Sequence, residues 1–445
     1  MAAPRDPAAP GGDRRPADLV AESLAVLRQN DVGPYTRPSP RLYPHQWNWD
    51  SAFVTLALAH LDWPRAESEV DALLAAQWTN GMLPHIRYNP GIAGYFPGPD
   101  WWPEVPVRRA GQRTSGISNP AVLPTTVYWA GRAQPDVRIR HTWWDRVYEP
   151  LRDALRFFSD RRTVADCPLI VMVHPWECGL DNSPRWDFAT RGGFRPSHPY
   201  TRHDTGVVAA AERPRAADYD LYLYLVELIA AHHYDLRAFL PRTPFAVYDA
   251  LFNAIWYRGV LDLHRIAEAL GRPPEWSADA LGAFRDAYHR VLWDGDANLF
   301  LDFDLRAGRT IPVHTIAGLG AVYGGLVDAA QAARMYRAYG ARCRGCRPLP
   351  TVPPDVPEYE PARYWRGPVW VNTNWFIARG LEELGLVPEA QTLADSTVEL
   401  VRQAGWCEYF HPATGEGLGG GDFSWTAALV IDLLRRPPGY RRRSP

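Results

Sequence analysis

The sequence has little cysteine and no long hydrophobic run, and each shortage excludes a class of protein. Its five cysteines in 445 residues are an odd number in a long chain, which is typical of a reducing compartment rather than of a disulfide scaffold. Cys343 and Cys346 have the spacing of half a zinc site, but no second pair of ligands follows them. We therefore predict that the protein binds no metal.

No apolar segment reaches the length that a signal peptide or a membrane-spanning helix needs. The first residues, Met1–Pro16, are instead rich in alanine, proline, glycine and arginine. The sequence therefore predicts a soluble, cytoplasmic protein that does not associate with membranes.

Neither sign of charge is in excess. The 48 Lys and Arg residues nearly balance the 50 Asp and Glu residues, which leaves a net charge of −2. Proteins that bind nucleic acid usually present a basic surface, so we expect no nucleic-acid partner. The hydrophobic fraction of 46% is sufficient for an ordinary packed core. An oligomer is compatible with this composition but is not predicted by it.

Alternating strand patterns are nearly absent, whereas helical spacing of apolar residues recurs along the chain. About a dozen helices, paired across short turns, predict an all-α fold, and we expect an (α/α)6 barrel of six inner and six outer helices. An open solenoid is the alternative, but the sequence has no fixed repeat period. Residues 1–15 and 435–445 are expected to be disordered and residues 16–434 to form one domain. The predicted helices are Ala17–Arg28, Ser51–Leu61, Ala66–Trp78, Pro120–Ala130, Trp143–Ser159, Ala217–Leu240, Pro244–Leu270, Ser277–Leu292, Val313–Tyr323, Val327–Tyr339, Asn372–Leu384, Val387–Ala404 and Ser424–Leu434.

Aromatic residues are abundant, with 19 Trp and 21 Tyr. Flat, amphipathic rings suit the faces of sugars, although core packing is the default interpretation of any single ring. Trp, Tyr, His and acidic residues concentrate in four loop-like regions, which are 43–50, 81–99, 174–187 and 364–370 with 408–412.

The segment 174–187 combines three carboxylates and two indoles around a turn at Asn182-Ser183-Pro184. A carboxyl group held against aromatic rings is poorly hydrated, and this raises its pKa. A carboxylic acid that stays protonated near neutral pH is what the cleavage of a glycosidic bond requires. The alternative is that these acids are ordinary residues of a surface turn.

Two further acids lie in loops. Glu408 follows a predicted helix and precedes Pro412. The glycines of Thr414–Gly421 do not form a phosphate-binding loop, because no Gly-Lys-Ser/Thr closes the segment, and they indicate a tightly bent backbone instead. Asp50 precedes a predicted helix, either as its N-cap or as an acceptor for sugar hydroxyls.

Three stretches together resemble the inverting glycosidases of glycoside hydrolase family 63, namely WECGLDNSPRWD, YWRGPVW and EYFHPATGEGLGGGDFSWTA. The similarity extends from about Leu42 to Leu434, and it is most specific for the branch that hydrolyses glucosylglycerate and mannosylglycerate. The resemblance implies a catalytic (α/α)6 barrel that needs no cofactor. It assigns the general acid to Asp181 and the general base to Glu408.

The resemblance also implies a sugar pocket. Its residues are Tyr43, Trp47, Trp49, Asp50, His85, Tyr95, Trp176, Tyr364 and Trp365. Arg213 and Tyr219 match the pair that holds the glycerate carboxylate in this branch, since a guanidinium group meets a carboxylate with paired hydrogen bonds. The alternative for Arg213 is an exposed side chain beside a helix start.

Two positions depart from the family pattern. Asn119 and Asp422 stand where the branch usually has glutamine, and both positions are expected to contact the sugar. The departures leave the exact substrate open. Arg185 and Asp187 are expected to support the Asp181 turn.

The sequence therefore predicts an inverting α-glycoside hydrolase that acts on a small glycoside, most specifically glucosylglycerate or mannosylglycerate. Three alternatives remain open at this point. They are a broader α-glucosidase or trehalase-like hydrolase, a non-catalytic sugar-binding protein and a helical scaffold for protein partners.

Overall fold

The computed structural model describes residues 15–164 and 167–435. The terminal segments predicted to be disordered, 1–15 and 435–445, lie outside the described residues except for Arg15, the N-cap of α1, and Arg435, the last residue of α15. Within the described ranges, helices dominate the fold and every strand is two residues long. The prediction of a helix-rich fold with little strand structure is therefore confirmed.

Fifteen α-helices are present in the described residues. They are α1 (Pro16–Gln29), α2 (Asn48–Leu61), α3 (Trp63–Leu74), α4 (Leu123–Ala133), α5 (Val137–Arg161), α6 (Asp187–Thr190), α7 (Ala216–Ala231), α8 (Leu236–Phe239), α9 (Ala250–Ala269), α10 (Ala278–Leu292), α11 (Gly320–Gly324), α12 (Ala329–Arg342), α13 (Val371–Glu383), α14 (Val387–Ala404) and α15 (Ser424–Arg435).

The sequences of the helices determine how deeply each one is buried. Every residue of α2 from Asn48 to Ala59 is buried, because this helix is apolar on all its faces. In α5, by contrast, Trp144, Val147, Leu151, Leu155 and Phe158 are buried, and their spacing of three or four residues places them on one face. Helices such as α2 therefore form the interior, and helices such as α5 cover it.

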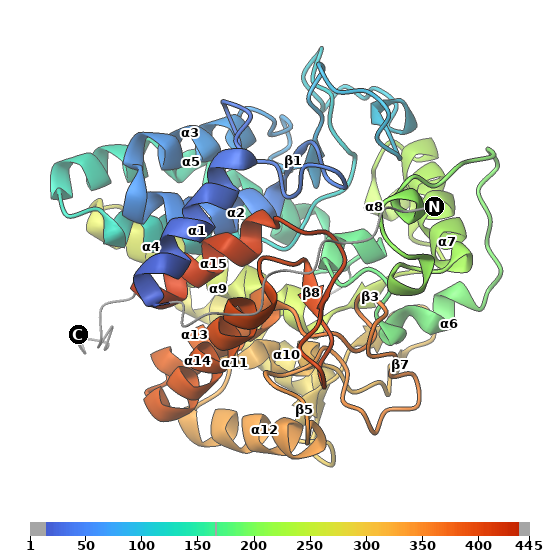
Figure 1. The fold of residues 1–445 in the computed structure, drawn as a ribbon. Helices are drawn as coiled ribbons and strands as arrows, with labels where there is room; N and C mark the ends of the chain where they lie inside the picture. The colour runs from blue at the N-terminus through green and yellow to red at the C-terminus, as the bar shows by residue number, and fades with distance from the viewer. Residues whose placement is uncertain (1–14, 165–166, 436–445) are drawn as a thin grey trace.

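The buried helices pack against one another in a closed order. Helix α2 contacts α4, α4 contacts α9, α9 contacts α11, α11 contacts α13, α13 contacts α15, and α15 returns to α2. Helices α1, α3, α5 and α14 pack on members of this set. Figure 1 shows the long helices α1 to α5 and α13 to α15 on the left of the view, and α6 to α8 with β3 and β7 on the right.

The strands connect loops rather than form a layer. β1 (Gln46–Trp47) pairs with β2 (Ile86–Arg87), β3 (Val247–Tyr248) with β6 (Phe303–Asp304), β6 with β7 (Arg309–Thr310), β4 (Trp293–Asp294) with β5 (Leu299–Phe300), and β8 (Tyr409–Phe410) with β9 (Gly417–Leu418), all antiparallel. β1 directly precedes α2, so its pairing fixes the loop at the N-terminal end of that helix.

Two predicted helices are interrupted. The segment predicted as Ala217–Leu240 divides into α7 and α8, because His233 and Tyr234 adopt positive φ angles of 53° and 61°, which a helix cannot contain. The segment predicted to begin at Pro244 starts with β3, and its helix begins only at Ala250.

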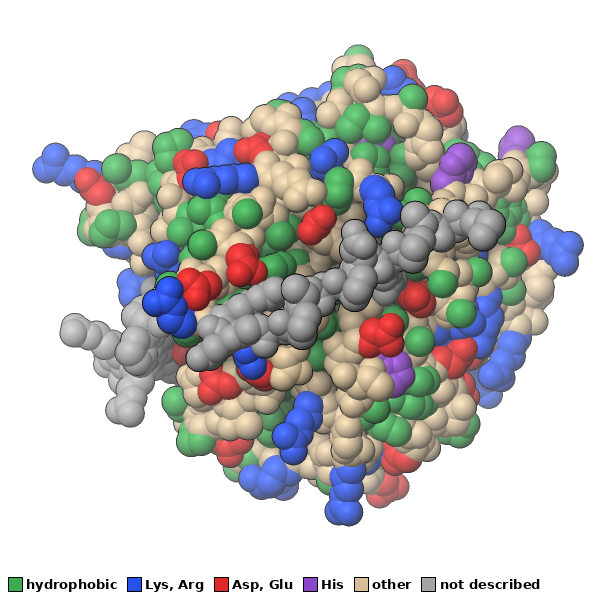
Figure 2. Space-filling view, viewed as in Figure 1, with side chains coloured by type: hydrophobic (Ala, Val, Ile, Leu, Met, Phe, Trp, Pro, Cys, Tyr) green, Lys and Arg blue, Asp and Glu red, His purple; other side chains and the backbone are tan. Residues whose placement is uncertain are grey.

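The distribution of surface charge and the character of the helices can be compared with those of nucleic-acid-binding and membrane proteins. Acidic and basic side chains are interspersed on the face that Figure 2 shows. Among the helices of the described residues, none combines the length and the apolar character that crossing a membrane requires.

Candidate active site

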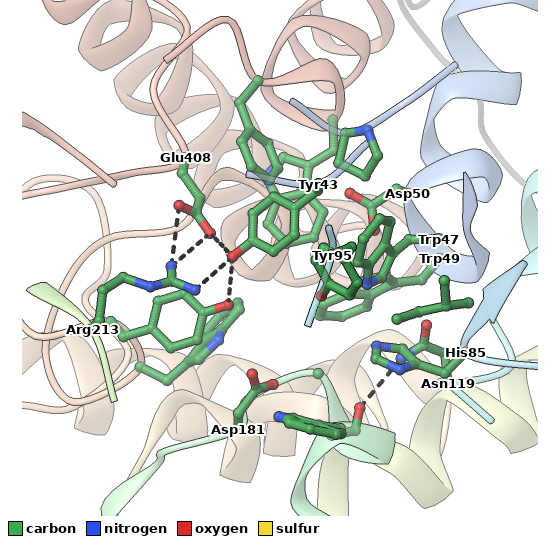
Figure 3. A pocket seen from close by; sticks show the side chains of 18 of the residues that line it. Tyr43, Trp47, Trp49, Asp50, His85, Tyr95, Asn119, Asp181, Arg213 and Glu408 are labelled. Carbon is green, nitrogen blue, oxygen red and sulfur yellow. Dashed lines mark hydrogen bonds and ion pairs between the residues drawn. The ribbon is translucent and has the colours of Figure 1, made fainter. Parts of the chain in front are cut away.

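A cavity at the N-terminal ends of α2 and α15 collects nearly all the predicted site residues. The predicted residues that line it are Tyr43, Trp47, Trp49, Asp50, His85, Tyr95, Asn119, Trp176, Asp181, Arg213, Tyr219, Tyr364, Trp365 and Glu408. Sequence reasoning missed six other lining residues, which are Pro38, Ile86, Pro97, Gly179, Phe423 and Trp425. Figure 3 shows Asp181 and Glu408 entering this cavity from different segments of the chain.

The carboxyl group of Asp181 has few partners. No other described residue donates a hydrogen bond to it, and burial raises its pKa to about 8, an effect that the positive charge of Arg213 partly opposes. A poorly hydrated carboxyl group without donors is more stable in its neutral form. Asp181 therefore carries a proton at neutral pH.

The turn that carries Asp181 is fixed from several sides. Arg185 is buried and donates to Asp249 and Asp302 at 2.9 and 2.8 Å, and the Asn182 Oδ1 atom accepts from the Trp365 backbone N–H at 3.0 Å. Asp187 binds both terminal nitrogens of Arg366, at 2.7 and 2.9 Å. These contacts place Arg185 and Asp187 in the support of the turn and outside the residues that line the cavity.

Gly179 is also required for this turn. It has a φ angle of 76°, and a Cβ atom at this position would collide with the ring of Trp49. A glycine is therefore needed for the aromatic wall to lie directly against the Asp181 turn.

Glu408 lies in the opposite environment. Its carboxylate accepts a hydrogen bond from the Tyr43 hydroxyl at 2.8 Å and from the Gly420 backbone N–H at 2.9 Å, and the Arg213 Nη1 atom lies 3.4 Å away. Burial raises the pKa of Glu408, while Arg213 and these hydrogen bonds act to lower it. The donors stabilise the charged form, so this is the carboxyl group equipped to act as a base.

The glycine-rich segment makes these contacts possible. Gly419 has a φ angle of 70°, and a Cβ atom there would collide with the Glu408 carboxylate. The prediction of a tightly bent backbone near the pocket is confirmed, and the bend brings the Gly420 N–H to Glu408.

Arg213 is buried in the site rather than exposed beside a helix start. Its Nη2 atom donates to the Tyr43 hydroxyl at 2.9 Å, its Nε atom donates to Asp204 at 3.1 Å, and its guanidinium group lies 4.3 Å from the centre of the Tyr364 ring. The interpretation of Arg213 as an exposed side chain is therefore wrong. The dashed lines in Figure 3 mark its contacts with Tyr43 and Glu408.

Several polar atoms of the cavity-lining residues are buried without a hydrogen-bond partner in the part of the chain that the structure describes. They are Asp50 Oδ1, His85 Nδ1, Asn119 Oδ1, Trp365 Nε1 and Trp425 Nε1. Leaving such groups unsatisfied costs about 1–3 kcal/mol each. Burial lowers the pKa of His85 to about 3, so this ring is neutral. A ligand rich in hydroxyl groups matches this set of donors and acceptors.

Aromatic rings form the walls between these polar atoms. Tyr95 meets Trp47 edge to face at 5.2 Å, and His85 stacks on Trp176 at 6.3 Å. Trp365 stacks on Trp370 at 3.6 Å. Such rings exclude water and offer flat apolar faces to a sugar ring.

The structure corrects two interpretations. Asp422, predicted to touch the sugar, is exposed and its carboxylate lies 3.4 Å from the Gln29 amide nitrogen. Its φ angle of 50° turns the chain so that Phe423 lines the cavity instead. Asp50 is not the N-cap of α2, because the helix begins at Asn48, and its side chain faces the cavity.

The CxxC pair lies apart from this cavity. Cys343 is buried and Cys346 is partly buried. Within the described ranges, no group of three or more His, Cys, Asp or Glu side chains is placed to hold a metal ion.

The helix-rich fold and an aromatic cavity with two differently held carboxyl groups define a glycoside hydrolase. A family model described as the mannosylglycerate hydrolase MGH1-like glycoside hydrolase domain matches residues 43–426. The chain belongs to this family.

Characterised relatives are similar over nearly the whole chain. The mannosylglycerate hydrolase of Rubrobacter radiotolerans is 38% identical, over 94% of this chain and 97% of its own. The glucosylglycerate hydrolase of Mycolicibacterium hassiacum is 34% identical, over 94% and 98%. The crystal structure of the GH63 mannosylglycerate hydrolase of Thermus thermophilus with Tris and D-glycerate matches with a TM-score of 0.87 and 37% identity, over 94% of this chain and all of that one.

Proposed function

We propose that this protein is an inverting α-glycoside hydrolase that releases glycerate from glucosylglycerate or mannosylglycerate. The observation that carries the proposal is the contrast between its two cavity carboxyl groups. Asp181 has no donor and a raised pKa, whereas Glu408 is held by Tyr43, Gly420 and Arg213. Two acids with opposite environments are the arrangement that acid–base cleavage of a glycosidic bond requires.

In the proposed reaction, Asp181 transfers its proton to the glycosidic oxygen as the bond to the anomeric carbon breaks. A water molecule attacks the opposite face of that carbon, and Glu408 takes a proton from it. The products are a free sugar of inverted configuration and the aglycone alcohol. This geometry requires carboxyl groups ~6.5–9.5 Å apart, so that a water molecule fits between the base and the sugar.

The sugar is proposed to bind between the aromatic rings that line the cavity. The unpartnered atoms of Asp50, His85 and Asn119 would bond to its hydroxyl groups, and the faces of Trp47 and Trp49 would contact its ring. Binding would satisfy polar groups that are otherwise buried without partners, and this favours a sugar over an apolar ligand.

The glycerate part of the substrate is suggested by the named relatives and by Arg213 and Tyr219, which both line the cavity. Arg213 lies 3.4 Å from the Glu408 carboxylate, and a guanidinium group pairs well with a carboxylate. Tyr219 and Arg213 also line one adjoining cavity together.

The fold proposed for residues 16–434 is a single (α/α)6 barrel. The closed packing order of α2, α4, α9, α11, α13 and α15 supports it as the inner ring. The helices that alternate with them along the chain, α1, α3, α5, α10, α12 and α14, would form the outer ring.

Proton NMR during hydrolysis tests the function and the stereochemistry together. We expect the β-anomer of the released sugar to appear first from an α-linked substrate, with glucosylglycerate and mannosylglycerate turned over faster than trehalose or kojibiose. An α-anomer as first product would refute inversion. Faster cleavage of the disaccharides would instead support a broader α-glucosidase, and sugar binding without hydrolysis would support a sugar-binding protein.

A further inference from the structure

A second cavity adjoins the first one. The two share Tyr43, Tyr95, Arg213 and Tyr219, and the second is also lined by Asp204. Of the shared residues, Tyr43 and Arg213 contact Glu408, and Tyr219 packs against Trp176 on the segment that also carries Asp181. The inference rests on the proposed function: the aglycone would lie in the second cavity, beside Arg213 and Tyr219, which line both cavities.

Asp204 and Arg213, which line the second cavity, form an ion-pair cluster with Arg202. The Asp204 carboxylate accepts hydrogen bonds from Arg202 at 3.0 and 2.7 Å and from the Arg213 Nε atom at 3.1 Å. The side chains of Arg202, Asp204 and Arg213 are only 14%, 11% and 4% exposed. One carboxylate thus lies between two guanidinium groups, which is the arrangement that the carboxylate of an incoming anion would itself need.

Arg213 donates to Asp204, Glu408 and Tyr43 from its Nε, Nη1 and Nη2 atoms, so an incoming anion shares this guanidinium group with two carboxylates of the protein. Glu408 is the less mobile partner, since it is buried, adjoins the β8–β9 pair and is also held by Tyr43 and Gly420. Asp204 belongs to a short 3-10 turn, Asp204–Gly206, between exposed neighbours. Of these two carboxylates, Asp204 is the one that lines the second cavity.

We propose that Asp204 is a specificity-determining residue that competes with the aglycone carboxylate for Arg213. It neutralises this guanidinium group when the aglycone site is empty, and an anionic aglycone has to share the group with it. This competition weakens the binding of the free anion, and so it speeds release of the product. A neutral aglycone gains nothing from the exchange.

Isothermal titration calorimetry with D-glycerate tests the proposal, and glycerol serves as the neutral analogue. In the Asp204→Asn variant the competing charge is gone, so we expect the Kd of D-glycerate to fall about tenfold, as for the loss of one hydrogen bond between charged groups. The KM of the glycerate glycoside should fall in parallel, without an increase in kcat. The affinity for glycerol should not change.

Two further variants control the result. Asp220→Asn removes an equal charge from a residue that accepts a bond from Tyr200 and does not touch Arg213, and its D-glycerate Kd should match that of the wild type. Asp204→Glu keeps the charge and should also stay near the wild type.

A weaker or unchanged affinity of Asp204→Asn for D-glycerate would overturn the inference, because Asp204 would then only position the arginines. An equal gain in Asp220→Asn would reduce it to a general effect of charge. Calorimetry needs no turnover, so a wild-type protein without hydrolytic activity would refute the proposed function and leave this comparison valid.

Discussion

Polar side chains at the two ends of the buried helices differ in whether they have hydrogen-bond partners. At the N-terminal ends, Asp50 of α2 and Trp425 of α15 have polar atoms without partners. At the C-terminal ends, Asp432 of α15 accepts hydrogen bonds from Trp375 at 2.7 Å and from Arg379 at 3.0 Å. Asp50 and Trp425 thus keep a polar atom unsatisfied beside the cavity, whereas the Asp432 carboxylate at the opposite end of α15 is satisfied.

The difference separates groups that serve function from groups that serve stability. A buried polar atom without a partner destabilises the folded state, and the unpartnered atoms that line the cavity are placed to bind a ligand. A buried charged side chain that forms ion pairs can link two helices and so stabilise the fold. Arg258 of α9 illustrates this, because it binds Asp262 of the same helix and Glu383 of α13. The comparison predicts which substitutions affect catalysis and which affect folding.

The largest expected effect is on turnover. Asp181→Asn and Glu408→Gln should each lower kcat by about 10²–10⁴-fold, because each removes one proton transfer from the reaction. The free energy of unfolding should not decrease in Asp181→Asn, and Glu408→Gln should remain folded, since Arg213 keeps Asp204 as a charged partner. Steady-state hydrolysis assays and denaturant titration check the two expectations separately.

Near wild-type turnover in either variant would remove that residue from the mechanism. A variant that is inactive but also unfolded would be uninformative, and circular dichroism distinguishes this case. Asp187→Asn is a useful control, because it weakens the support of the Asp181 turn through Arg366 without removing an acid from the cavity.

At the C-terminal ends of the helices, a substitution should lower stability and leave turnover nearly unchanged. Asp432→Asn removes the nearer of the two carboxylates that pair with the buried Arg379, so we expect the free energy of unfolding to fall by about 3 kcal/mol. Turnover at a temperature where the variant is folded should stay within about twofold of the wild type, since Asp432 does not line the cavity.

The surface pair Arg156–Asp160, half-exposed on α5, provides the matched control for this variant. Asp160→Asn removes the same kind of charge pair at an exposed position and should cost less than about 1 kcal/mol. Equal losses in the two variants would contradict the assignment of the C-terminal ends to stability.

A smaller effect is expected from Tyr43→Phe. This change removes a donor to Glu408 and an acceptor for Arg213, so the pKa of Glu408 should rise. The acidic limb of the kcat/KM profile should then move upward by about one pH unit, the value of one hydrogen bond to a charged group.

Tyr364→Phe is the control for the acidic limb. The Tyr364 hydroxyl lies 3.3 Å from that of Tyr43, but it makes no hydrogen bond to Glu408. Its removal should leave the position of the limb unchanged even if the rate falls. A shift of the same size in both variants would mean that Tyr43 does not set the protonation of Glu408.

The sequence predicted the helices well because they depend on local patterns, whereas the residues that line the cavity followed from the family resemblance. Apolar spacing indicated every long helix, and clusters of Trp, Tyr and acid indicated the loops. It placed Asp422 wrongly because the direction of a side chain at a positive φ angle is not visible in a motif. It could not indicate Asp204 or the unpartnered atoms, because these depend on which distant loops meet.

The smallest expected effect concerns stability and pH. Asp181 has a pKa of about 8 in the folded protein but an ordinary value near 3.9 when unfolded. Between these values the unfolded chain releases a proton that the folded protein keeps, so this residue destabilises the wild type increasingly as the pH rises from about 4 to about 8. Asp181→Asn removes the cost. The variant should therefore be more stable than the wild type by about 1–2 kcal/mol at pH 9. The gain is this small because the Asp181 side chain opens onto the cavity, where solvent screens its charge. At pH 5 the gain should be much smaller. Thermal unfolding at the two pH values measures the difference. An equal gain at both would mean that Asp181 is already ionised at pH 5, and the acid would then have to be sought elsewhere in the cavity.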